Sequence, residues 1–75
     1  MYADPNSVRY SHRDGKRYVN CSITSTSTPA SFPATGEDVL NLDAEDIIDT
    51  GSTLLVTDTG DLYMYDENRV AQPVG

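Results

Sequence analysis

Apolar and polar residues alternate in two stretches of the chain, and a turn-forming sequence interrupts each stretch. The first stretch, residues 8–24, is divided by Asp14 and Gly15, a pair that favours the type I′ turn of a β-hairpin. After this turn the alternating positions Val19, Cys21 and Ile23 are apolar, which gives an extended strand one apolar face. We therefore predict a first β-hairpin over residues 8–24.

A second hairpin is predicted over residues 53–72, where two β-rich runs flank the sequence Asp-Thr-Gly-Asp at 58–61. Asp and Gly at this tip favour a turn, because Gly accepts a positive φ. The alternating faces of the two runs are formed by Leu54 with Val56, Leu55 with Thr57, Leu62 with Met64, and Tyr63 with Tyr65. The strand register decides which faces meet the core, and the alternation leaves it open.

The remaining segments are less regular. Residues 1–7 are predicted to form an extended N-terminal arm, and residues 69–72 a short third strand that Pro73 ends. Residues 25–46 combine a Ser/Thr/Pro linker with an acidic segment, in which Asn41 or Asp43 is a candidate cap for a short helix or helical turn. Phe32 stands alone in the linker, which is either a plain connection or an arm that Phe32 anchors on a neighbouring subunit.

We predict one small, mostly β domain, in which the two hairpins form a small antiparallel sheet or sandwich. The chain has 75 residues and is 37% hydrophobic, so it buries a small core. One Cys cannot form an internal disulfide, and one Cys with one His cannot complete a zinc site. Because these usual means of stabilising small domains are missing, we expect self-association or docking on a larger protein.

The net charge of −7 is unevenly distributed. Residues 1–36 hold four cations and two carboxylates, whereas residues 37–75 hold one cation and ten carboxylates. Such an acidic chain repels nucleic acid and anionic membranes, so neither is expected as a partner. The basic turn of Arg13, Lys16 and Arg17 is a candidate electrostatic contact. Neither a signal peptide nor a membrane-spanning stretch is expected from the sequence.

Candidate catalytic chemistry is limited to the sequence Asp-Thr-Gly, which occurs at residues 49–51 and 58–60. Residues 47–54 resemble the signature of aspartic proteases, in which two Asp carboxylates from two lobes or two subunits share a proton and activate water. Fifteen residues follow the second copy, too few for such a lobe, and Asp-Thr-Gly is also common in turns. We interpret both copies as turns and predict no enzymatic activity and no catalytic residues.

Metal and cofactor sites are not expected either. The carboxylates cluster without the spacing of a calcium-binding loop. His12 and Cys21 are the only base and thiol of the chain, and the apolar alternation around Cys21 predicts a buried, inert thiol.

Two segments carry a resemblance to a known class of proteins. Residues 33–39 (Pro-Ala-Thr-Gly-Glu-Asp-Val) and 51–66 (Gly-Ser-Thr-Leu-Leu-Val-Thr-Asp-Thr-Gly-Asp-Leu-Tyr-Met-Tyr-Asp) resemble small accessory structural proteins of tailed bacteriophages. The resemblance implies a virion component, such as a head-decoration, head-fibre or neck or tail accessory subunit. Such a subunit is made in the host bacterial cytoplasm and docks on a capsid or tail protein or on copies of itself.

Two other functions stay open at this point. One is a small acidic inhibitor that binds a basic site on a host protein, and the other is a fragment similar to an aspartic protease. For a docking subunit, aromatic anchors and cations are the expected contacts. The predicted partner-binding residues are Phe32, Tyr63, Tyr65, Arg13, Lys16 and Arg17.

Overall fold

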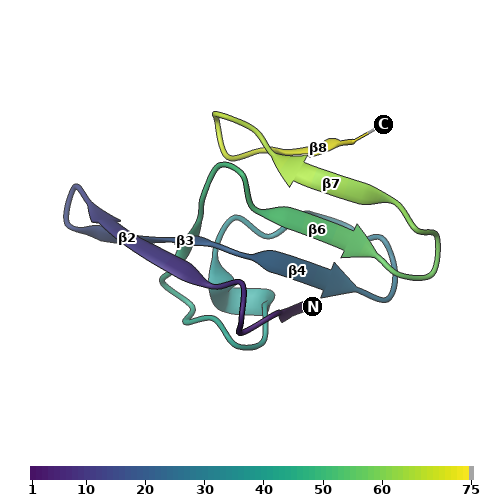
Figure 1. Ribbon diagram of the computed structural model, residues 1–75, viewed down its shortest axis with the longest axis horizontal. Coiled ribbons are helices and arrows are strands. Elements are labelled where there is room, and N and C mark those ends of the chain that lie inside the picture. Colours follow the sequence, from purple (N-terminus) through teal and green to yellow (C-terminus); the bar gives the residue numbers. More distant parts are fainter. Residues whose placement is uncertain (75) are drawn as a thin grey trace.

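The computed structural model describes residues 1–74, which form two small mixed β-sheets and one turn of 3₁₀ helix (Figure 1). The mostly β fold predicted from the sequence is confirmed. The five-stranded sheet has the order β1-β4-β6-β7-β8, and the three-stranded sheet has the order β2-β3-β5. The elements are β1 (Tyr2–Ala3), β2 (Arg9–Arg13), β3 (Lys16–Asn20), β4 (Ser22–Ser25), η1 (Gly36–Asp38), β5 (Ile47–Ile48), β6 (Thr53–Val56), β7 (Leu62–Tyr65) and β8 (Ala71–Pro73).

The first predicted hairpin is confirmed as β2 and β3. Asp14 and Gly15 have φ values of 55° and 72°, as a type I′ turn requires. The predicted outgoing strand, however, is divided between the two sheets. The chain leaves the three-stranded sheet after Asn20 and enters the five-stranded sheet as β4. The apolar alternation nevertheless holds across this crossing, since Val19, Cys21 and Ile23 are all buried.

The second predicted hairpin is confirmed as β6 and β7, which pair antiparallel. Both sheets are mixed rather than antiparallel, because β4 pairs parallel with β6 and β3 pairs parallel with β5. The long connection between β4 and β6 returns the chain to the end of the sheet where β4 began. The two predicted hairpins therefore belong to different sheets.

The segment predicted as a linker forms a layer of the domain. It crosses behind the five-stranded sheet in Figure 1 and packs Val39 into the core, with Phe32 and Leu42 against it. The helical turn predicted to follow Asn41 or Asp43 is wrong, because Ile47 and Ile48 form strand β5 beside β3. The observed 3₁₀ turn comes earlier and is capped by Thr35. The buried core consists of Ala3, Val19, Cys21, Ile23, Val39, Ile48, Leu54, Val56 and Tyr65.

Both ends of the described chain are strands on the edges of the five-stranded sheet. The predicted N-terminal arm forms β1, which pairs with β4 and buries Ala3 completely. The predicted third strand is β8, and it includes Pro73 rather than ending before it. The amide of Val74 donates to the carbonyl of Leu62 (2.9 Å), so the nitrogen of the preceding Pro73 faces the free edge. Proline is compatible with that position because it needs no hydrogen bond there.

Candidate functional site

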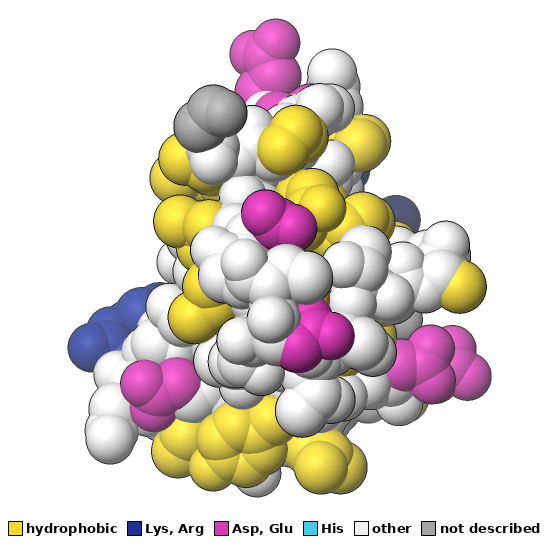
Figure 2. Space-filling view, turned by 90° about the vertical axis from the view of Figure 1, so that its right-hand side faces the viewer, with side chains coloured by type: hydrophobic (Ala, Val, Ile, Leu, Met, Phe, Trp, Pro, Cys, Tyr) yellow, Lys and Arg dark blue, Asp and Glu magenta, His cyan; other side chains and the backbone are white. Residues whose placement is uncertain are grey.

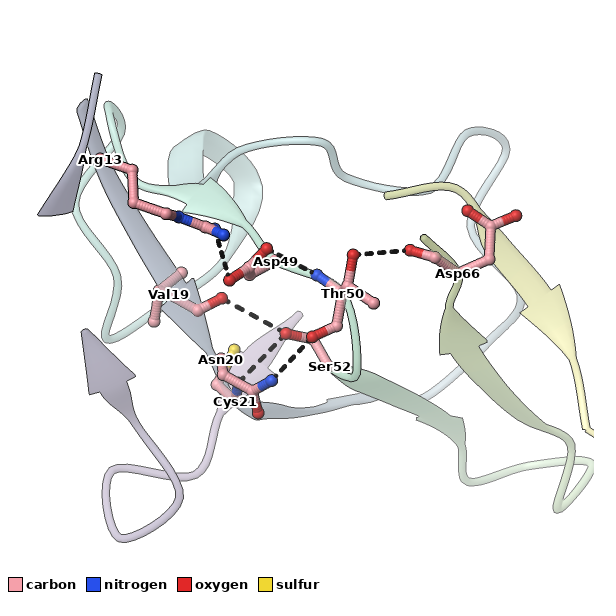
Figure 3. Close-up of polar contacts among 8 residues, drawn as sticks. All are labelled: Arg13, Val19, Asn20, Cys21, Asp49, Thr50, Ser52 and Asp66. Atoms are coloured by element: carbon pink, nitrogen blue, oxygen red, sulfur yellow. Dashed lines mark hydrogen bonds and ion pairs between the residues drawn. The ribbon is translucent and has the colours of Figure 1, made fainter. Parts of the chain in front are cut away.

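The Asp-Thr-Gly-Ser sequence at residues 49–52 is the turn that joins β5 to β6 (Figure 3). One carboxylate oxygen of Asp49 pairs with Arg13 (2.7 Å), and the other accepts a hydrogen bond from the amide of Thr50 (2.9 Å). The Thr50 hydroxyl donates to the backbone carbonyl of Asp66 (2.8 Å). Each polar side chain of this turn therefore has a structural partner.

The end of the same turn ties the two sheets together. The hydroxyl of Ser52, which is fully buried, donates to the carbonyl of Val19 (3.3 Å) and accepts from the amide of Cys21 (3.2 Å). These bonds fall where the chain crosses from one sheet to the other. The bond to the Cys21 amide satisfies a backbone donor at the crossing, whereas the Val19 carbonyl also accepts from the amide of Asp49 (2.9 Å).

The two Asp-Thr-Gly copies lie at opposite ends of β6. Asp49 precedes this strand and Asp58 follows it, and a strand of four residues extends about 13 Å. A single chain thus keeps these carboxylates far beyond the distance at which two Asp residues share a proton. The geometry supports the interpretation of both copies as turns.

The basic turn of the first hairpin pairs mostly within the chain. Arg17 pairs with Asp43 and, through Nε, with Asp46 (2.6 Å), whose side chain is buried. The Arg13 guanidinium, already paired with Asp49, also lies over the ring of Tyr18 at 4.1 Å. Of the three predicted electrostatic contacts, Arg13 and Arg17 therefore have intramolecular partners. Lys16 is exposed, and no ion pair to it occurs within residues 1–74.

The predicted aromatic contact face points into the molecule. Tyr65 is 2% exposed, and its hydroxyl donates to the carbonyl of Pro33 (2.5 Å). Burial raises the pKa of Tyr65 to about 12. Tyr63 is half-buried against Phe32, with ring centroids 4.6 Å apart. The prediction that Tyr65 binds a partner is wrong, because the register turns the Tyr63 and Tyr65 face onto the core.

The opposite face of the five-stranded sheet carries the exposed apolar residues. Tyr2 pairs with Thr24, Thr24 with Leu55, and Leu55 with Leu62, so these side chains form one row across four strands. Val74 continues the row through its hydrogen bond to Leu62, and Met64 lies two residues further along β7 on the same face. We call this surface the outer apolar face and define it as Tyr2, Leu55, Leu62, Met64 and Val74.

Each member of the outer apolar face is between 37% and 49% exposed. Figure 2 shows hydrophobic side chains along the left edge and at the base of the molecule. That left edge is the side of the sheet turned toward the viewer in Figure 1, away from the layer formed by residues 26–46. The core covers only the inner face of this sheet, and the described chain leaves the outer one bare.

A shallow recess extends this face beyond the β1 edge. It has a volume of about 340 Å³ and a mainly apolar lining, which comes from Met1, Tyr2, Thr24, Ser25, Thr26, Leu40 and Thr57. Leu40, which bridges to Tyr2, is 67% exposed. Tyr2 belongs to both surfaces, so the recess and the outer apolar face are continuous.

Carboxylates border the outer apolar face. The Asp66 carboxylate accepts a hydrogen bond from the side chain of Gln72 (3.1 Å), which is the cross-strand partner of Met64. A backbone hydrogen bond from Val70 lowers the pKa of Asp66, so this group is ionised at neutral pH. Asp58 and Asp61 are exposed in the turn at the other end of β6 and β7.

Sequence reasoning missed this face, although one signal was present. The two strands of the second hairpin are apolar on both faces, since Leu55 alternates with core residues and Leu62 and Met64 alternate with Tyr63 and Tyr65. A sheet that is solvated on one side usually alternates apolar with polar residues. Apolar residues on both faces indicate a sheet whose two faces are both covered by other protein surfaces.

Other candidate chemistry finds little support in the geometry. Burial raises the pKa of the Cys21 thiol to about 11, so it remains protonated and poorly nucleophilic at neutral pH. Residues 1–74 place no group of three or more His, Cys, Asp or Glu side chains where they could hold a metal ion. No helix within the same residues is long and apolar enough to cross a membrane.

Comparisons of the chain with protein-family models, curated proteins and solved structures found no match.

Proposed function

We propose that this chain is a non-enzymatic structural subunit that docks through its outer apolar face onto a larger protein. The observation that carries the proposal is the row of exposed side chains, apolar except for Thr24, on a sheet whose other face already holds the core. The largest exposed apolar patch of a soluble protein is often a functional surface. The resemblance of residues 33–39 and 51–66 to phage accessory proteins supports a tailed-phage virion as the assembly.

The energetics favour docking in an assembly over a tight binary contact. Complete burial of a large apolar side chain contributes about 1.5–3 kcal/mol, so covering the part still exposed contributes about 1 kcal/mol for each of five residues. Association itself costs about 4–15 kcal/mol in lost translational and rotational freedom. The outer apolar face alone therefore gives weak binding. A subunit held at repeated sites or by several contacts fits this strength better.

A small acidic inhibitor is the second candidate, and the carboxylates around the outer apolar face favour it. Asp58, Asp61 and Asp66 would face a basic site on a host protein. Both candidates use the same surface. They differ in whether the chain remains with the finished particle.

Mass spectrometry of density-gradient-purified particles of the encoding phage tests the proposal. We expect the chain in the particle band at a constant ratio to the major capsid or tail protein. The double variant Leu55→Thr/Leu62→Thr should be depleted from the particles, whereas the control Val70→Thr, at an exposed valine outside this face, should be retained. A chain abundant in infected cells but absent from particles would refute the virion role and favour the inhibitor.

A further inference from the structure

We infer that the surface covering the outer apolar face belongs to a different protein, one with an apolar centre bordered by Lys and Arg side chains, and not to a second copy of this chain. This inference rests on the docking function proposed above and specifies the chemistry of its partner. Its basis is the charge around the face, the position of the chain's own cations, the state of the sheet edges and the size of the face.

The charge at the border opposes a face-to-face pair of copies. Asp66 lies at one end of the face, and Asp58 and Asp61 lie at the other. Two copies, each with a net charge of −7, would bring these carboxylates together. Like charges placed opposite each other across an interface cost several kcal/mol. A partner with cations at the corresponding positions turns the same border into an attraction.

The chain's own cations cannot supply this border. Arg13 and Arg17 are paired with Asp49, Asp43 and Asp46. The β2–β3 hairpin that carries them projects from one end of the molecule, whereas the β6–β7 turn lies at the other end (Figure 1). Lys16 lies in the same hairpin, and Arg9 donates to the carbonyls of Asn6 and Val8. Arg69, in the turn between β7 and β8, lies over the ring of Tyr18 in β3 at 5.5 Å. A second copy that presents its outer apolar face therefore presents mainly carboxylates around it.

The edges of the five-stranded sheet are poorly suited to strand addition. At one edge the nitrogen of Pro73, which has no hydrogen to donate, faces outward. At the other edge Leu40 already bridges to β1, and it exchanges backbone hydrogen bonds with Met1 and Ala3. Docking by the face of the sheet is therefore favoured over pairing at its edges.

The size of the face also argues against a stable dimer. Neighbouring strands lie about 4.8 Å apart, so the row from β1 to β8 spans about 19 Å, and strands of four residues extend about 13 Å. This footprint of about 250 Å² is well below the roughly 800 Å² that each partner buries in a stable interface. Additional attraction is needed, and the charged border and the recess beside Leu40 are the places where a heterologous partner gains it.

Sedimentation velocity of the purified chain tests the exclusion of a second copy. We expect a monomer at low salt and at micromolar concentration, for the wild type and for Leu55→Thr/Leu62→Thr alike. A dimer at low salt that this double variant abolishes and that Val70→Thr retains would overturn the inference.

Binding of two designed peptides tests the chemistry of the partner. Both are amphipathic peptides of one length with the same Leu face, and one carries Lys where the other carries Glu. In NMR titrations of the isotope-labelled chain, the Leu/Lys peptide should shift the amide signals of β1, β4, β6 and β7, and its affinity should fall with salt. Stronger binding of the Leu/Glu peptide, or shifts confined to the β2–β3 hairpin, would overturn the inference.

Two variants with the same change in net charge distinguish the effect of the border carboxylates on peptide binding from the effect of net charge alone. Asp58→Asn/Asp61→Asn removes two border carboxylates and should weaken Leu/Lys binding about tenfold. Glu37→Gln/Asp38→Asn removes two carboxylates from the 3₁₀ turn in the layer behind the sheet and should have a much smaller effect. Equal losses in the two variants would show that only net charge acts and would overturn the inference.

Failure of this inference differs from failure of the proposed virion role. A chain that stays in particles, but whose outer face prefers the Leu/Glu peptide, retains the virion role and loses the inference. A chain that is absent from particles, but binds the Leu/Lys peptide on this face, loses the virion role and retains the inferred partner chemistry.

Discussion

The hydroxyl of Tyr65 offers a sharp test of how this small domain is held together. Tyr65 lies on β7 with 2% of its surface exposed, and its hydroxyl donates a 2.5 Å hydrogen bond to the carbonyl of Pro33. This bond joins the five-stranded sheet to the segment that crosses its inner face. Substitution Tyr65→Phe removes one oxygen atom and keeps the ring, so it isolates the contribution of the hydrogen bond.

The expected loss follows from the burial of the acceptor. Pro33 is itself buried, and its carbonyl has no other hydrogen-bond donor within residues 1–74. A buried group left without its partner costs about 1–3 kcal/mol, compared with a net value of about 0.5–1.5 kcal/mol for a typical hydrogen bond. We therefore expect Tyr65→Phe to lower the free energy of unfolding by about 1–3 kcal/mol. For a domain of this size each kcal/mol lowers the melting temperature by about 4–8 °C.

Urea denaturation followed by circular dichroism measures this loss. Tyr63→Phe is the matched control, because Tyr63 lies on the same face of the same strand, is half-buried, and makes no hydrogen bond through its hydroxyl within residues 1–74. The control should change the free energy of unfolding by less than about 0.5 kcal/mol. Equal effects of the two substitutions, or no effect of Tyr65→Phe, would refute the reasoning.

Three further predictions concern stability. Burial raises the pKa of Cys21 from 9.0 to about 11 and that of Tyr65 to about 12, so the folded state holds these protons more tightly than the unfolded state. The resulting stability is complete below pH 9 and is lost as the pH rises toward 12, which urea midpoints measured across this range should show. Arg69 adopts a positive φ of 59°, so Arg69→Gly should raise the free energy of unfolding by up to about 1 kcal/mol, and an unchanged or lower midpoint would contradict this. A Cβ at Gly36 would collide with the backbone of Asp43, so thermal melts should show a larger loss for Gly36→Ala than for Gly60→Ala, where the space is open and only the φ of 77° is unfavourable.

The candidate site was only partly predictable from the sequence. Alternation divides β7 into two faces, but the sequence of this strand does not show which face packs on the core. The answer comes from β6, whose Leu54 and Leu55 face Tyr63 and Leu62 across the ladder. Because Leu54 is completely buried, Tyr63 and Tyr65 turn inward and Leu62 and Met64 turn outward. The aromatic residues expected at an interface thus stabilise the subunit, and aliphatic ones take their place.

The charge pairing of the basic turn was also not predictable from the sequence. Arg13, Lys16 and Arg17 are adjacent in sequence and were predicted to form one contact. The carboxylates that pair with the two arginines follow them by 26 to 36 residues. Only the fold brings that acidic segment beside the hairpin, and it leaves the turn with less free charge than the sequence suggested.

The sequence by itself determined the two hairpins and their turns, because Asp14 with Gly15 and the Gly60 turn act through backbone preferences that neighbouring residues carry. Tertiary structure decided that the chain crosses between the sheets after Asn20, that β3 and β4 find parallel partners, and that the outer apolar face stays uncovered. These features depend on contacts between residues far apart in the chain. Alternation with a period of two predicts which residues share a face of a strand. Only the packing of the whole molecule determines whether each face is covered by the core or exposed to solvent.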